Sequence, residues 1–265
     1  MRKRVLGAVG IVLLVALALA SAAAVMIQER GGGAELLERF GFQGAEEQQA
    51  GPSAGPPALG PAAGAEVGPP VSLTFDTDPA GRLPDGFVAA RTGPGADGTW
   101  VVLAEPGAPS PPHVLAQTST DATSGRFPMA VATGGTYGDL DLSVKFKAIS
   151  GRVDQAGGLV FRYRDANNYY LVRANALENN YRLYHVVRGT RTQIAGSNLR
   201  VTANAWHTLR VVCAGEQIEA YYDGQRAITA RDATFRGPGL VGVWTKADSV
   251  TYFDDLVVQG VAAAT

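Results

Sequence analysis

The stretch 157–188 constrains the fold of this chain more than any other part of the sequence. It reads GGLVFRYRDANNYYLVRANALENNYRLYHVVR, with three runs of aromatic and branched residues separated by polar segments at 165–168 and 177–180. Such runs favour β-strands, and short polar segments between them are typical of hairpin loops. The stretch therefore predicts three consecutive antiparallel strands.

The rest of the chain from residue 71 onward carries the same strand and turn signals. Residues 141–148 alternate apolar and polar side chains, and Asp223-Gly224 suits the positive φ angles of a tight hairpin turn. No long stretch of helical periodicity follows residue 43. Many short strands joined by Gly, Pro and Asx turns predict an all-β domain over residues 71–261, built as a two-sheet antiparallel sandwich. Further strands are expected at 71–75, 100–103, 113–117, 191–194, 206–213, 217–222, 240–244 and 250–258.

The first 70 residues have a different character. Residues 1–4 are basic and residues 5–27 carry no charge. Residues 1–27 fit either a signal peptide, with Ala20-Ser21-Ala22 as cleavage signal, or an uncleaved hydrophobic helix that anchors the chain in a membrane. Both alternatives export the domain to the cell envelope, where it is either secreted or membrane-anchored. The membrane is an expected partner only if the N-terminal segment is not cleaved. Residues 28–70 are rich in Gly, Ala and Pro and predict a disordered linker.

The charge balance excludes one class of partner. From residue 71 onward the chain has eighteen Lys or Arg and eighteen Asp or Glu residues. A nucleic-acid-binding domain usually shows a basic excess, so no nucleic acid is expected as a partner. Cys213 is the single cysteine, so the chain forms no internal disulfide.

A pattern typical of one group of domains runs through nearly all of 71–260. It comprises GGLVFRYRDANNYYLVRANALENNYRLYHVVRG, WHTLRV, YYDGQ and GLVGVWTKADSVTYFDDLVV. The sequence resembles the concanavalin A-like lectin and glucanase jelly-roll domains of bacterial exported proteins. More narrowly, it resembles their 3-keto-disaccharide hydrolase-like group, next to laminin-G-like modules. The resemblance implies two curved sheets, neighbouring first and last strands, and ligands on the concave sheet or its rim loops.

Hairpin geometry predicts which side chains of the stretch 157–188 share a face. Directly opposed residues lie on the same face, and loops at 165–168 and 177–180 fix the pairs. The expected pairs are Arg162 with Leu171, Arg173 with Tyr184, and Asn175 with Arg182. One face is expected to form the core, with Leu159, Phe161, Tyr163, Tyr170, Val172 and Ala174. The other face is expected to hold a polar patch of Arg162, Arg173, Asn175, Arg182 and Tyr184.

This polar patch suits a hydroxyl-rich ligand. Guanidinium and amide groups can bond vicinal hydroxyls, and a tyrosine ring can stack on a sugar ring. A glycan or other saccharide is therefore the expected partner, and the alternative is a solvated sheet face. Lys246 and Asp248 follow a predicted strand, where they either reach a site at the rim or form an ordinary turn ion pair.

Candidate catalytic groups are few. Many glycosidases need two carboxyl groups about 5–10 Å apart, and the domain has no Glu-x-Asp-x-x-Glu run. Glu178, in the loop beside the patch, is the one glutamate considered as catalytic, with an exposed turn residue as the alternative. His185 lies on the same hairpin, on the opposite side, and is the other candidate base. The spacing of the three histidines indicates no metal ligands, so no metal site or cofactor is expected.

Three functions remain open from the sequence. The first is a non-catalytic, carbohydrate-interacting module of an exported or membrane-tethered protein, which we favour. The second, suggested by the resemblance alone, is a 3-keto-disaccharide hydrolase. A 3-keto group acidifies the neighbouring C2 proton, so cleavage by elimination would need one base and an electrophile, and a divalent metal would enter only in this case. The third is a structural envelope module without a ligand.

Overall fold

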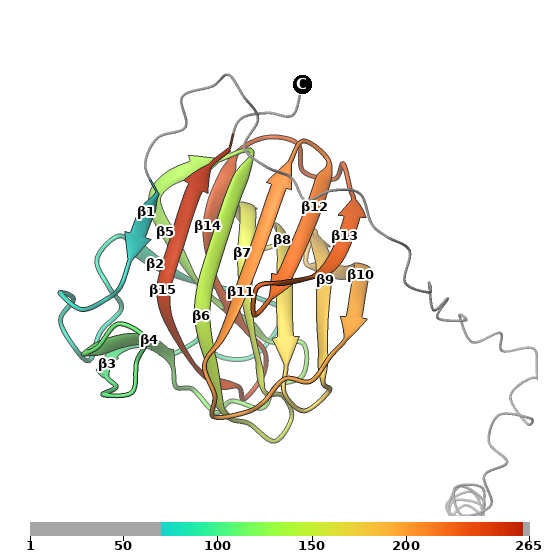
Figure 1. The fold of residues 1–265 in the computed structure, drawn as a ribbon. Coiled ribbons are helices and arrows are strands. Elements are labelled where there is room, and N and C mark those ends of the chain that lie inside the picture. The colour runs from blue at the N-terminus through green and yellow to red at the C-terminus, as the bar shows by residue number, and fades with distance from the viewer. Residues whose placement is uncertain (1–69, 262–265) are drawn as a thin grey trace, which may run out of the picture. The chain divides into compact units, whose positions relative to one another are not determined.

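The computed structural model describes residues 70–261, which form two antiparallel β-sheets without a helix (Figure 1). One sheet contains β1 (Val71–Leu73), β3 (Trp100–Ala104), β4 (His113–Gln117), β6 (Leu140–Ser150), β11 (His207–Ala214), β12 (Gln217–Tyr222), β13 (Gln225–Arg231) and β15 (Val250–Gly260). Its order is β13-β12-β11-β6-β15-β4-β3, with β1 also paired to β15. The other sheet contains β2 (Phe87–Thr92), β5 (Phe127–Tyr137), β7 (Ala156–Asp165), β8 (Asn168–Asn175), β9 (Asn180–Val187), β10 (Thr190–Asn198) and β14 (Gly239–Thr245). Its order is β10-β9-β8-β7-β14-β5-β2.

This architecture confirms the predicted fold class. The two sheets pack face to face as a sandwich, and β1 pairs with β15 so that Val71 lies opposite Val258, as the resemblance implied (Figure 1). The expected hydrophobic helix and disordered linker lie outside the described residues. Within residues 70–261 no helix has the length and apolar character that crossing a membrane requires.

Apolar side chains fill the space between the sheets. In the β7–β8 hairpin Leu159 pairs with Val172 and Phe161 with Tyr170, and all four side chains are fully buried. The Phe161 and Tyr170 rings stack with centroids 5.2 Å apart. Alternate residues of a strand point to opposite faces, so these four share the core face. Their predicted place in the core is confirmed.

The predicted places of Arg162 and Tyr163 are wrong, because β7 has an irregular register between Phe161 and Asp165. Val160, rather than Arg162, lies opposite Leu171. Arg162 has a φ of 45°, which an L-residue rarely adopts. The inserted residue reverses the alternation, so Tyr163 joins a cluster on the face away from the inter-sheet core.

Arg162 is instead a buried structural residue. Its Nε and Nη1 donate hydrogen bonds to the carbonyl oxygens of Gly138 and Phe235, each at 2.7 Å, and its Nη2 donates to Asp139 Oδ1 at 3.0 Å. Phe235 belongs to the inter-sheet core. These three bonds offset the strain of the positive φ. Arg162 therefore lies apart from Arg173 and has no part in a common polar patch.

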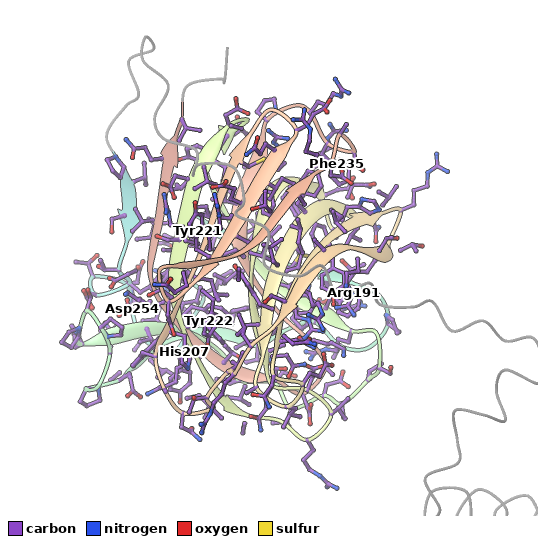
Figure 2. All side chains as sticks on the ribbon, turned by 45° about the vertical axis from the view of Figure 1, so that its right-hand side comes forward. Arg191, His207, Tyr221, Tyr222, Phe235 and Asp254 are labelled. Carbon is purple, nitrogen blue, oxygen red and sulfur yellow. The ribbon has the colours of Figure 1, made fainter. Side chains whose placement is uncertain are left out.

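Asp254 on β15 ties a loop to the eight-stranded sheet (Figure 2). Its side chain is fully buried and accepts hydrogen bonds from the backbone N–H groups of Ser110 and Asp255, each at 2.8 Å. Burial raises the pKa of Asp254 to about 6, although these hydrogen bonds act in the opposite direction. In the folded protein the carboxyl group therefore releases its proton at a pH of about 6.

Replacing Asp254 with Asn should remove part of the pH dependence of stability. The folded-state pKa lies above the unfolded value of about 3.9, so the folded state binds the proton more tightly. This stabilisation is complete below about pH 4 and is lost as pH rises through about 6. The free energy of unfolding of the wild type, relative to Asp254→Asn, should thus fall between these values. Urea denaturation across the range measures it, and a constant separation of the two curves would refute the assignment.

Candidate functional site

A second cluster of apolar side chains lies on the face of the seven-stranded sheet that turns away from the inter-sheet core, here called the outer face. Its members alternate with the core residues along β5, β7, β8, β9 and β14. The Phe127 and Trp244 rings stack there with centroids 5.3 Å apart. Tyr169 and Tyr184 lie in the same cluster. The outer face therefore has an aromatic floor, which the sequence analysis did not identify.

Four of the five residues of the predicted polar patch share this outer face. Arg173 pairs with Arg182, and Leu171 pairs with Tyr184. The predicted partners are shifted by two residues, because the hairpin loop is 176–179 instead of 177–180. A shift of two preserves the side-chain alternation, so the predicted common face of Arg173, Asn175, Arg182 and Tyr184 is confirmed.

Arg173 is the centre of a buried hydrogen-bond network. Its guanidinium donates to Glu178 Oε2 at 2.8 Å, to Asn180 Oδ1 at 3.0 Å and to Tyr184 Oη at 3.2 Å. Its side chain is only 4% exposed. Partial burial acts against ionisation of Glu178, but the hydrogen bonds from Arg173 and Asn180 prevail and lower its pKa. The Glu178 carboxylate is therefore a weak base. The Arg173 guanidinium is buried, so it is not the exposed hydrogen-bond donor that the sequence predicted.

The network continues toward the rim of the sheet through Asn175. The Asn175 side-chain amide donates to Asp154 Oδ1 at 2.8 Å, and Lys246 forms an ion pair with the other oxygen of Asp154. Burial raises the pKa of Asp154, while Lys246 opposes this effect. Lys246 thus pairs with Asp154 and not with Asp248. Asp154 and Asn180 could not be recognised as site residues from the sequence, because their partners lie on neighbouring strands or loops.

Asp248 shapes the rim loop 151–155. Its carboxylate accepts hydrogen bonds from the backbone N–H groups of Arg152, Val153 and Asp154, at 2.7 to 3.1 Å. Burial alone would favour the protonated form, but these backbone bonds lower its pKa. Beside it lies a cavity of about 520 Å³, here called the rim cavity. Its lining residues are Thr120, Ala122, Ser150, Gly151, Arg152, Val153 and Asp248.

Arg126 holds together the loops around the rim cavity and was missed by the sequence analysis. It is fully buried, and its guanidinium donates to the carbonyl oxygens of Ala96 at 2.6 Å, Asp97 at 2.9 Å and Ala247 at 2.7 Å. It also donates to Ser119 Oγ at 3.0 Å. Ser119 and Ala247 adjoin the cavity residues Thr120 and Asp248. Arg126 therefore positions the walls of the cavity without lining it.

The remaining predicted site residues lie elsewhere. Arg182 donates to Asn198 Oδ1 at 2.6 Å, on the edge strand β10. His185 faces the other side of β9, where its Nδ1 lies 3.3 Å from Asp232 Oδ2 and 3.2 Å from Thr234 Oγ1. Glu178 and His185 are therefore on opposite faces of the sheet and cannot act together on one substrate. Among residues 70–261, no group of three or more His, Cys, Asp or Glu side chains could hold a metal ion.

Similarity to known proteins lies in the fold. No protein-family model and no curated protein sequence matches the chain. The carbohydrate-binding module CBM66 from Bacillus subtilis aligns with a TM-score of 0.54 at 18% sequence identity, over 69% of this chain and 99% of that module. A Bacillus subtilis protein of unknown function with a galectin-like fold aligns with a TM-score of 0.48 at 9% identity, over 67% and 90%. The likeness to the first of these two shows a shared β-sandwich fold.

Proposed function

We propose that the domain is a non-catalytic carbohydrate-binding module whose saccharide ligand occupies the rim cavity. The observation that carries the proposal is a cavity of about 520 Å³ with polar groups left free in its wall. Within residues 70–261, the side chains of Thr120, Ser150 and Arg152 make no hydrogen bond or ion pair. They offer two hydroxyls and a guanidinium to a ligand, and pockets of this size commonly hold small ligands.

The apolar part of the cavity suits the same class of ligand. Val153 is 49% exposed at the cavity wall and can contact the C–H face of a sugar ring. The neighbouring Asp248 carboxylate is fixed by the backbone and can accept a hydrogen bond from a sugar hydroxyl. The shared fold with a carbohydrate-binding module supports this choice of ligand class, while the cavity provides the argument for the site.

Export is part of the proposal and rests on the sequence alone. A basic start followed by an uncharged stretch at 5–27 is the pattern of a signal peptide or membrane anchor. Either one would present the module outside the cytoplasm, where polysaccharides are accessible.

The proposal does not extend to cleavage of 3-keto-disaccharides. Elimination requires a free base beside the substrate. The hydrogen bonds from Arg173 and Asn180 engage Glu178, and His185 is turned toward Asp232 on the opposite face. Neither candidate base is thus placed at the rim cavity.

Replacing Arg152 with Ala should weaken saccharide binding about tenfold or more. A hydrogen bond to a charged group contributes about 1.5–3 kcal/mol, and Arg152 supplies the one cation in the cavity lining. The full-length protein would first be screened on an array of neutral and acidic oligosaccharides, and the best ligand titrated by calorimetry. Arg188→Ala is the matched control, because Arg188 is an exposed arginine in the β9–β10 turn, at the other end of the sheet. Absence of any saccharide binding, or equal losses in both variants, would refute the rim cavity as the site.

A further inference from the structure

Arg191 lies over the aromatic floor of the outer face. It extends from β10, an edge strand of the seven-stranded sheet (Figure 2). Its Cζ atom is 4.5 Å from the ring centroid of Tyr184, 4.7 Å from that of Phe127 and 5.8 Å from that of Trp244. Cation–π contacts with three rings keep the guanidinium in place. They do not supply a negative charge.

Two cations of this face lack a carboxylate, Arg182 and Arg191, and Arg182 is hydrogen-bonded to Asn198 instead. Arg173 is neutralised by Glu178, and Lys246 by Asp154. Arg191 makes neither a hydrogen bond nor an ion pair in the described part of the chain. Burial lowers the pKa of Arg191, and the nearby Arg173 contributes to this effect. The two ion pairs cancel, so Arg182 and Arg191 leave the face with an excess of positive charge.

Unsatisfied donors accompany the excess charge. Arg191 Nη1 and Arg173 Nε are both buried and have no hydrogen-bond partner among residues 70–261. Guanidinium groups can only donate, so an acceptor is what this face lacks. Arg191 as a whole is half-buried, which leaves it accessible to a ligand from solvent. Gln193, two residues further along β10, is exposed and faces the same side, where its amide is free to bond a hydroxyl group.

We infer that the outer face binds the carboxylate group of an acidic saccharide, such as a uronic acid residue, against Arg191. The inference rests on the proposed function, because it names the class of saccharide. A carboxylate brings a negative charge to Arg191, which has neither an ion pair nor a hydrogen bond in the described part of the chain. The two carboxylate oxygens fit the planar guanidinium fork. Gln193 then contacts hydroxyl groups of the sugar ring.

Calorimetry with tri-galacturonate and its methyl ester tests the inference. The ester has a methyl group in place of each negative charge, so the full-length protein should bind the acid about tenfold or more tightly than the ester. Arg191→Gln should remove this preference, while Arg191→Lys, which keeps the charge, should retain part of it. Arg188→Gln should leave the preference intact. Thermal unfolding of each variant shows whether it is folded, and the Lys variant keeps the test valid if the Gln variant is not.

Three results would overturn the inference. They are equal affinity for acid and ester, a preference that persists in Arg191→Gln, and competition by acetate as effective as that by the trisaccharide. The last result would indicate a site for any carboxylate, without recognition of sugar. If neutral saccharides bind and depend on Arg152 while the acid has no advantage, this inference fails and the proposed function stands. If no saccharide binds, the proposed function fails as well.

Discussion

Replacing Arg126 with Met should lower the free energy of unfolding by about 3–5 kcal/mol, because the change removes one partner of a buried polar network. Methionine fills much of the space but cannot donate a hydrogen bond. The carbonyl oxygen of Ala247 would then lose a donor in a buried position, and those of Ala96 and Asp97 in partly buried positions. Each unsatisfied buried acceptor costs about 1–3 kcal/mol, and partial relaxation of the loops reduces the sum.

Urea denaturation of Arg126→Met and of the wild type measures this loss. Arg91→Met is the matched control, since Arg91 lies on β2 in the same region and makes an ion pair with the exposed Asp97 side chain. Exposed ion pairs contribute about 0–1 kcal/mol, so the control should change little. A loss below about 1 kcal/mol in Arg126→Met would mean that the loops do not depend on this guanidinium. If the loops do depend on it, saccharide binding at the rim cavity should weaken in the same variant.

The sequence predicted the sandwich because strand signals are local. The runs around Phe161, Tyr170 and Tyr184 alternate apolar and polar side chains, and this alternation sets both the strand and the face of each residue. An error of two residues in the second hairpin therefore left Arg173, Asn175 and Tyr184 on the predicted face.

The bulge in β7 was beyond such local reasoning. Arg162 leaves the regular pairing to reach Gly138, Asp139 and Phe235, which are 23 to 73 residues away in sequence. Nothing in the run VFRYR indicates that Arg162 forms these long-range hydrogen bonds. The consequence is large, because one inserted residue transfers Tyr163 from the core face to the outer face.

The candidate site could be predicted only in part, for the same reason. The sequence placed Lys246 and Asp248 directly after a strand, and β14 does end at Thr245. Their partners could not be predicted, since Asp154 and loop 151–155 come from a distant part of the chain. The net charge of the outer face could not be predicted from the sequence either. It depends on which cation each carboxylate reaches, and that leaves Arg191 without one.

Replacing Phe161 with Ala should also lower the free energy of unfolding by about 3–5 kcal/mol, through a cavity in the inter-sheet core. Phe161 is fully buried, and its ring stacks on Tyr170 at 5.2 Å. It also precedes the bulge, so a collapse of the backbone into the cavity would disturb the hydrogen bonds of Arg162. The backbone around Phe161 therefore cannot relax freely into the cavity. This favours a loss of stability in the upper part of the range of about 3–5 kcal/mol.

The midpoint of urea denaturation should fall in Phe161→Ala while the slope stays constant, as expected for a loss of stability without a change in the surface exposed on unfolding. Leu177→Ala is the control, because Leu177 is 48% exposed in the β8–β9 loop and its truncation should cost no more than about 0.5 kcal/mol. Phe161→Leu adds a second test, since leucine refills part of the cavity and should recover part of the loss. Equal effects of the Ala and Leu variants would mean that the aromatic ring itself, through its stacking on Tyr170, outweighs the cavity. An effect of Phe161→Ala as small as that of the control would place the side chain outside the core and contradict the register of β7.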